Sequence, residues 1–216
     1  MIRVSNVSKT FTMHNQGSAT IEVIRNASLH VDPGECVALS GVSGSGKSTL
    51  MRMIYGNYRA ASGSIMVDDV DVVQADPRTM IRLRQEKIGY VSQFLRVVPR
   101  VSTIDVVAEP ALQAGESLDD AYFHAADLLK RLRIPEALWS LSPLTFSGGE
   151  QQRVNIARGF SRYYPALLVD EPTASLDGEN RATVLRLIKR RNVAWRSSGS
   201  STMRRHGQKS VTAKLM

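Results

Sequence analysis

The pattern of apolar and polar positions along the chain predicts a domain in which strands and helices alternate. Apolar runs typical of strands, either continuous or alternating with polar residues, occur at residues 2–7, 35–40, 64–70, 88–92 and 166–170. Stretches with helical spacing lie between several of these runs. This order favours an α/β fold built on a mainly parallel sheet.

Helical periodicity is clearest from about residue 117 to residue 134. Four apolar residues fall on one face of this predicted helix, namely Tyr122, Ala125, Leu129 and Leu132. Ser117 is a suitable residue to cap its start, and Pro135 predicts its end, because the residue before a proline disfavours helical geometry.

Two further helices are predicted towards the end of the chain. One begins at Ser147, which forms a capping-box pattern with Glu150. The other runs from about residue 178 to residue 190, with Leu185 and Ile188 expected to face inward. We interpret residues 94–147, which are richer in helix than in strand, as a helical lobe inserted into a domain that spans residues 1–190.

The charge is distributed unevenly, which changes how the net value of +8 is interpreted. Up to Ile188 the chain has 20 basic and 20 acidic residues, whereas from Lys189 onward it has 8 basic residues and no acidic one. A tail of one sign is usually solvated and often disordered, so we expect residues 191–216 to be irregular. Because the remainder is neutral, nucleic-acid binding is not favoured.

Hydropathy and cysteine usage indicate a cytoplasmic protein. No stretch approaches the roughly 20 consecutive apolar residues of a membrane helix, and the first residues do not have the pattern of a secretion signal, so we expect no membrane insertion. The single cysteine, Cys36, has no partner in the chain for a disulfide, and its surroundings predict a buried strand in which it packs in the core.

A glycine-rich segment follows the second predicted strand and carries the strongest motif in the chain. It matches the pattern G-x-x-x-x-G-K-[ST] and consists of Gly41, Val42, Ser43, Gly44, Ser45, Gly46, Lys47, Ser48 and Thr49. Its backbone N–H groups are suited to hold phosphate oxygens, and Lys47 is suited to reach the β- and γ-phosphates. Ser48 is the predicted ligand of Mg²⁺. The motif predicts a site for ATP and Mg²⁺, and the residues leave the preference between ATP and GTP open.

Two adjacent carboxylates follow the last predicted strand. Asp170 comes directly after four apolar residues, which predicts that the strand delivers it to the edge of the sheet where α/β proteins bind ligands. We predict that Asp170 holds Mg²⁺. Glu171 is suited to orient and deprotonate an attacking water, which predicts hydrolysis of the nucleotide.

A second pair of glycines, Gly148 and Gly149, follows Ser147 and opens the helix with the capping box. Their N–H groups are arranged as in an anion site at a helix N-terminus. No lysine lies near them in the sequence. The chain would therefore have two phosphate sites, and this pair alone does not say whose phosphate the second one holds.

The sequence resembles the ATP-binding cassette ATPases from residue 1 to about residue 190. The resemblance rests on four stretches, namely GVSGSGKST, GYVSQFL, FSGGEQQRVNIAR and LLVDEPTASLD. It implies that the glycine pair binds the γ-phosphate held by the P-loop of a second subunit. The active unit would therefore be a homodimer or a dimer with a related subunit of the same family.

The same resemblance implies roles for three other residues. Gln93 would ligate Mg²⁺ and relay its presence to the helical lobe. Asp177 would contact the partner's P-loop. Phe11 occupies the position of an aromatic residue that stacks on adenine, although a place in the core is nearly as well supported.

Two branches of the family fit. The stretches around Gln93 and Ser147 look very similar to the L subunit of the bacterial carbon–phosphorus lyase system, which implies a partner in a soluble phosphonate-degrading enzyme assembly. The alternative is the ATPase of a lipoprotein-releasing or exporting membrane transporter. Arg96 and Arg100 after Gln93 favour a polar partner surface and hence the first branch.

The chain departs from the family pattern after about Lys189. The resemblance implies an apolar strand that ends in a histidine there, but no four consecutive apolar residues occur, and His206 follows two arginines. Our leading hypothesis is a shift of reading frame near residues 189–193, and the alternative is a genuine basic tail that binds a partner. A third possibility for function is therefore a damaged copy that binds ATP but is marginally stable and hydrolyses it poorly.

Overall fold

The structure is a computed structural model, and it describes residues 1–13, 19–173, 176–194 and 211–214. The chain forms two compact units, one of residues 1–84 with 192–216 and one of residues 85–191. Along the chain, strands and helices alternate in an α/β arrangement, as the sequence predicted.

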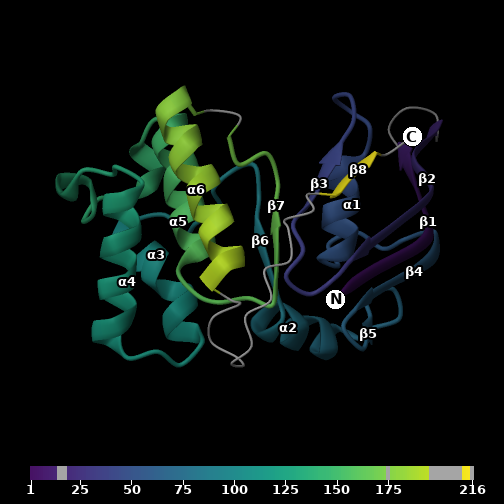
Figure 1. Cartoon of the computed structure of the whole chain (residues 1–216), viewed down its shortest axis with the longest axis horizontal. Helices are drawn as coiled ribbons and strands as arrows, with labels where there is room; N and C mark the ends of the chain where they lie inside the picture. Colours follow the sequence, from purple (N-terminus) through teal and green to yellow (C-terminus); the bar gives the residue numbers. More distant parts are fainter. Residues whose placement is uncertain (14–18, 174–175, 195–210, 215–216) are drawn as a thin grey trace. The chain divides into compact units, whose positions relative to one another are not determined.

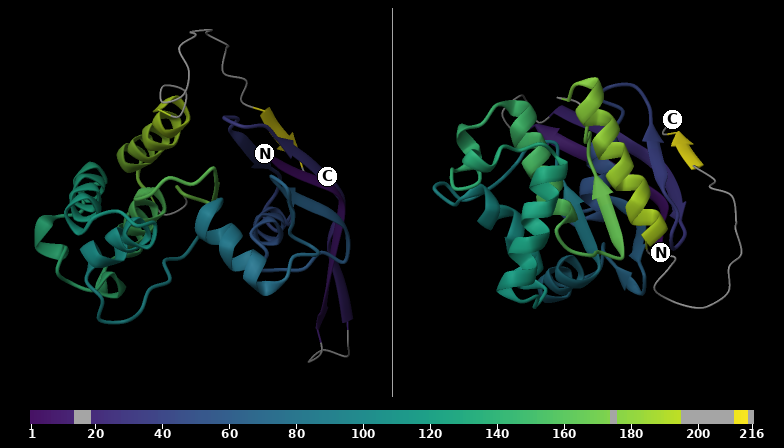
Figure 2. Two further views of the ribbon diagram at one scale, coloured as in Figure 1. Left: turned by 90° about the horizontal axis from the view of Figure 1, so that it is seen from below. Right: turned by 60° about the vertical axis from the view of Figure 1, so that its left-hand side comes forward.

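The first unit contains an antiparallel sheet with strand order β2-β1-β4-β5. These strands are β1 (Ile2–Met13), β2 (Ala19–Val31), β4 (Ser62–Val67) and β5 (Val70–Asp71). β1 and β2 run side by side as a long pair (Figure 2). The expectation of a mainly parallel sheet is therefore wrong for this sheet. The link between β1 and β2 is too short for the helical crossover that a parallel pair needs.

The first unit also contains the strand and the helix on either side of the glycine-rich segment. β3 (Val37–Ser40) pairs in parallel with β8 (Val211–Lys214), and α1 is Lys47–Ile54. The sequence did not predict β8, and the rest of the tail from residue 195 lies outside the described residues. Leu50, Met53 and Ile65 are among the fully buried side chains of this unit.

Cys36 does not lie in a buried strand. It is exposed and precedes β3 by one residue. The apolar run after it predicted the strand correctly, but the strand begins later than expected and its residues keep part of their exposure. The prediction that Cys36 packs in the core is therefore wrong.

The second unit is mainly helical around one parallel pair of strands, β6 (Ile88–Val91) and β7 (Ala166–Val169), which lie side by side (Figure 1). Its helices are α3 (Thr103–Gln113), α4 (Leu118–Arg131), α5 (Gly148–Phe160) and α6 (Gly178–Ala194), with two short 3₁₀ turns at Glu136–Leu138 and Pro143–Thr145. The helix α2 (Pro77–Glu86) lies at the boundary between the units.

The apolar face predicted for α4 is confirmed, since Ala125, Leu129 and Leu132 are buried in the core of this unit. Ser117 accepts a hydrogen bond from the backbone N–H of Asp120, which confirms the predicted cap.

The end of α4 comes earlier than Pro135 predicted. Arg133 adopts a left-handed φ of 56°, and the N–H of Ile134 donates to the carbonyl of Leu129. This pattern ends a helix without help from the proline.

The inward face of α6 differs from the prediction. Val184 is fully buried, whereas Leu185 is 46% exposed. Ile188 is partly buried against the core of the unit, as predicted. Only the first of the two predicted inward positions is thus wrong, by one residue, because the adjacent apolar residues Val184 and Leu185 do not by themselves define the rotation of a helix.

Candidate functional site

The glycine-rich segment forms the loop between β3 and α1, as the motif predicted. Its first four residues, 41–44, are exposed, and Val42 at 79% is the most exposed large apolar residue among those described. An apolar side chain at the tip of this loop is not stabilised by its exposure to water. The first part of the loop is therefore open to solvent.

Gly46 and Gly44 are required for different reasons. Gly46 caps the start of α1 with a left-handed φ of 86°, and a Cβ there would lie 2.9 Å from the carbonyl oxygen of Val23. Gly44 also has a left-handed φ, of 80°, but a Cβ there would meet nothing within 4 Å. The open space at Gly44 fits a loop whose backbone approaches a phosphate.

Lys47 is held by its own loop. Its Nζ donates to the carbonyl oxygens of Gly41 at 3.0 Å and Val42 at 2.9 Å, and it lies 3.5 Å from Ser45 Oγ. These contacts fold the side chain back over the loop, so its positive charge lies beside the carbonyl oxygens of Gly41 and Val42. This is the arrangement expected of a lysine that binds phosphate.

Asp170 is placed at the end of β7, as predicted. It is 1% exposed, and the hydroxyl of Tyr90 donates to its Oδ2 at 3.0 Å. Its backbone N–H donates to the carbonyl of Val91 on β6. The sequence did not indicate Tyr90, because nothing in a strand pattern shows which carboxylate a tyrosine hydroxyl will reach.

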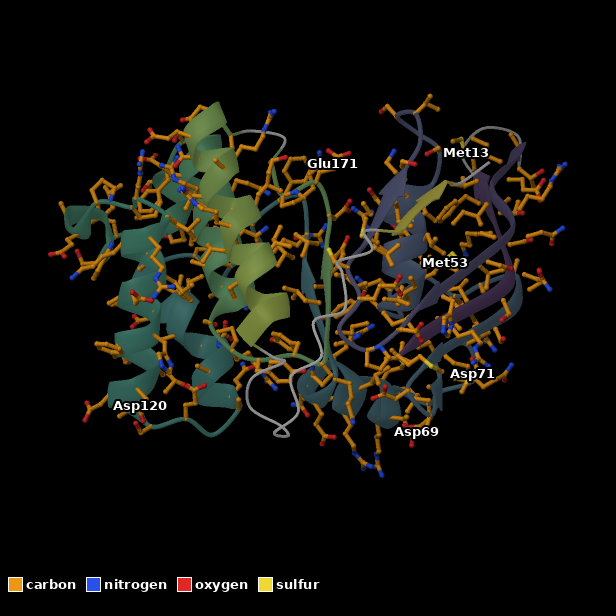
Figure 3. The ribbon with its side chains drawn as sticks, in the orientation of Figure 1. Met13, Met53, Asp69, Asp71, Asp120 and Glu171 are labelled. Carbon is orange, nitrogen blue, oxygen red and sulfur yellow. The ribbon has the colours of Figure 1, made fainter. Side chains whose placement is uncertain are left out.

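Glu171 follows in an uncommon conformation. Its φ is 48°, a left-handed value that a residue other than glycine rarely adopts. The side chain is exposed at the end of β7 (Figure 3), and Gln93 Nε2 donates to its Oε2 at 3.1 Å. Backbone strain of this kind is commonly found at functional sites. The structure therefore brings together Gln93 and Glu171, two of the predicted catalytic residues.

The predicted capping box at the start of α5 is present. Ser147 accepts from the N–H of Glu150, and the carboxylate of Glu150 accepts from the N–H of Ser147 at 2.9 Å and from its hydroxyl at 2.6 Å. These bonds from Ser147 lower the pKa of Glu150 below its usual value. The carboxylate of Glu150 therefore stabilises the first turn of α5 through its two bonds with Ser147.

Gly148, the first residue of α5, is exposed, and a Cβ there would meet nothing within 4 Å. Its φ is not in the left-handed region that favours glycine. Neither the packing of this chain nor its backbone therefore requires a glycine at this position. That observation fits a surface which something outside the chain approaches closely.

Two predicted binding residues have structural contacts of their own. Phe11 is half-buried, and its ring meets that of Tyr58 edge-on at 5.3 Å. Asp177 accepts from the backbone N–H and the side-chain amide of Asn180, both at 2.8 Å, and these bonds lower its pKa. Their roles towards adenine and towards a partner subunit stay predictions.

The donor set suits the predicted cofactors. The hydroxyl of Ser48, the amide oxygen of Gln93 and the carboxylate of Asp170 are oxygen ligands of the kind that Mg²⁺ prefers. When bound, Mg²⁺ would neutralise charge on the phosphates. Ser48 lies in the first unit and the other two residues in the second.

The chain matches the family model described as ABC transporter over residues 24–174. It is 32% identical over 195 residues to the uncharacterized ABC transporter ATP-binding protein MJ0796 of Methanocaldococcus jannaschii, covering 89% of this chain and 82% of that protein. It is 34% identical over 188 residues to the lipoprotein-releasing system ATP-binding protein LolD of Idiomarina loihiensis, covering 87% and 81% respectively.

A longer relative is the macrolide export ATP-binding/permease protein MacB of Rhodopseudomonas palustris, which is 39% identical over 172 residues. This match covers 80% of this chain but only 26% of that protein, so the chain spans about a quarter of its length.

The fold is similar to a solved dimeric structure of the ATP-binding cassette MJ0796 bound to ADP and phosphate. The TM-score is 0.83 at 28% sequence identity, and the match covers 100% of this chain and 88% of that one. The fold is thus that of the ATP-binding cassette P-loop ATPases. The chain belongs to the ABC transporter family, as one of its ATP-hydrolysing domains.

Proposed function

We propose that this chain is the ATPase subunit of a membrane transporter of the lipoprotein-releasing or exporting type, and that it works at the cytoplasmic face. The observation that carries the proposal is the match to LolD over most of both chains, at 34% identity. The similarity to MacB supports the same class of transporter.

This proposal reverses the order of the two hypotheses that the sequence supported. The segment after Gln93 favoured a soluble phosphonate-degrading assembly because of Arg96 and Arg100. In the structure this segment also exposes Phe94 at 69% and Val98 at 70%. The surface is therefore mixed rather than polar, and the argument from the arginines loses its force. The relatives named for transport then favour the membrane partner.

The chemical role follows from the residues described above. The P-loop with Lys47 would bind the phosphates of ATP, and Ser48, Gln93 and Asp170 would hold Mg²⁺. Glu171 would orient the attacking water and accept its proton, with Gln93 fixing the carboxylate by the hydrogen bond at 3.1 Å. Phe11 would contact the adenine ring.

The active unit would be a dimer. Supporting this, the start of α5 is exposed at Ser147 and Gly148, and its capping box uses the N–H groups of Ser147 and Glu150 but not those of Gly148 and Gly149. The similar MJ0796 cassette forms a dimer. In our proposal Ser147, Gly148 and Gly149 meet the γ-phosphate held by the other subunit, and Asp177 contacts that subunit's P-loop.

The test is isolation of the tagged chain from its own cells, with soluble and detergent-extracted fractions kept apart. We expect an integral membrane subunit in stoichiometric amount in the extracted fraction, and ATP hydrolysis by that complex which Glu171→Gln abolishes. Recovery with soluble enzyme subunits instead would contradict the transporter assignment and restore the phosphonate hypothesis.

A further inference from the structure

One face of α5 carries polar side chains that are not exposed to solvent. Gln152 is 5% and Asn155 is 7% exposed. With Arg158 they recur every three residues, a spacing that places them along one side of a helix. Buried polar groups on a helix normally have a specific partner, so each raises the question of what it holds.

The partners are backbone carbonyls of the two segments that carry Gln93 and Glu171. Asn155 Nδ2 donates to the carbonyl of Ser92 at 2.6 Å. Arg158 Nη1 donates to the carbonyl of Arg96 at 3.0 Å. The backbone is thus attached to α5 immediately before Gln93 and three residues after it.

Two further contacts complete this attachment. Gln152 Nε2 donates to the carbonyl of Glu171 over a longer 3.4 Å. At the other end, a Cβ on Gly159 would lie 2.2 Å from Val91 Cγ2, so glycine allows α5 to pack directly on the end of β6. There is little free space between α5 and the strand that leads into Ser92.

We propose that Asn155 is a positioning residue for Gln93. It lies two turns along α5 from Ser147 and Gly148, and its amide fixes the backbone from which the side chain of Gln93 reaches Glu171. A movement of the N-terminus of α5 is thereby transmitted to the Gln93–Glu171 contact. The inference rests on the proposed function, since it gives that contact its meaning in ATP hydrolysis.

The geometry also explains why the residue is an asparagine. The site needs a short donor that reaches a carbonyl at 2.6 Å from inside a packed face. Leucine has the same branching at Cγ but no donor, and it is larger. Asn155→Leu therefore removes the hydrogen bond and leaves the carbonyl of Ser92 without this partner, and Asn155→Ala removes the same bond without adding bulk.

A matched control is available in the same unit. Thr103 is fully buried, and its Oγ1 donates to the carbonyl of Leu141 at 2.8 Å. Thr103→Val removes one buried hydrogen bond from a side chain to a carbonyl, as Asn155→Leu does, but at a place with no contact to Gln93 or Glu171 among the contacts described here. Asn155→Ala is a second variant in case the leucine prevents folding.

The first measurement is hydrogen exchange of the full chain without nucleotide. We expect the backbone N–H groups of residues 92–96 to exchange faster in Asn155→Leu, by up to about tenfold, which is the fold-change that corresponds to the loss of one hydrogen bond. Thr103→Val should leave this segment unchanged. Unchanged exchange at residues 92–96 in both Asn155 variants would overturn the proposal, whatever their ATP turnover.

The second measurement is ATP turnover. In Asn155→Leu we expect kcat to fall about tenfold while KM for ATP stays within about twofold, because the P-loop is untouched. A KM effect with unchanged kcat would overturn the positioning role. If the parent chain hydrolyses no ATP in its complex, the proposed function fails, and with it the catalytic meaning of the link. The exchange result still decides whether Asn155 holds the segment.

Discussion

Replacing Gly148 by alanine separates what this residue does for its own chain from what it does for a partner. Within the chain the change is free of clashes, since a Cβ meets nothing within 4 Å and φ is not left-handed. Alanine is a better helix former than glycine by up to about 1 kcal/mol, and less than that in the first turn. We therefore expect the free energy of unfolding to stay the same or to rise slightly.

The effect on the proposed dimer has the opposite sign. If the N–H groups at the start of α5 approach a partner's phosphate, a methyl group added beside them on the Cα of residue 148 forces the helix away. A hydrogen bond to a charged group is worth about 1.5–3 kcal/mol, so loss of one lowers dimer affinity roughly ten- to hundredfold.

The assay measures dimerisation of the chain in the presence of ATP by sedimentation. The chains also carry Glu171→Gln, so that the nucleotide is not hydrolysed during the measurement. Chemical unfolding of the same proteins gives the stability. Two results would refute the reasoning. Dimerisation equal to that of the Gly148 chain would show that no phosphate comes near, and a loss of stability above about 1 kcal/mol would show that the glycine serves its own fold.

Three other predictions follow from the structure. Leu129→Ala, at a fully buried side chain, should lower the free energy of unfolding measured in urea by about 2–5 kcal/mol. Phe123→Ala, at a side chain that is 72% exposed, should change it by less than about 0.5 kcal/mol. Because the pKa of Glu150 is lowered from its usual 4.5, its carboxylate stabilises the fold above that pH, and the stabilisation is lost as the pH falls through the lower folded pKa. The difference in the free energy of unfolding between the parent and Glu150→Gln should therefore shrink between about pH 6 and pH 3. A difference that stays constant with pH would contradict the capping role. Lys47→Ala should weaken ATP binding measured by calorimetry, and affinity equal to that of the parent would show that the amine does not reach the phosphates.

The sequence predicted most of what depends on local chemistry. The P-loop, the cap at Ser117 and the capping box at Ser147 were all placed correctly, because each depends on a few neighbouring residues with one favourable arrangement. β2 was missed although apolar and polar residues alternate over residues 26–31, because the adjacent Val23 and Ile24 interrupt that alternation and most of the strand is exposed. β8 was missed for a related reason, since residues 211–214 contain no continuous apolar run.

The candidate site was predicted in its main residues but not in its supports. Glu171, Asp170 and Gln93 follow from strand ends and motifs. Asn155 and Gln152 could not be predicted in the same way, because a polar residue on a helix is expected to face solvent unless its partner in the folded chain is known. The family was predicted correctly, whereas the branch was inferred from the resemblance of two stretches to the L subunit of the carbon–phosphorus lyase system and from two arginines whose surroundings only the folded chain reveals. The hypothesis of a frame shift concerns residues that lie mainly outside the described ranges and stays a prediction.

The folded-back position of Lys47 has a consequence for selectivity. Its ammonium group is already partly stripped of water by the carbonyls of Gly41 and Val42. A ligand offering a single neutral oxygen would therefore gain nothing by displacing them, whereas a polyphosphate brings several charged oxygens to the same place. The two hydrogen bonds of Lys47 therefore favour ligands of high charge density over neutral ones, independently of the base of the nucleotide.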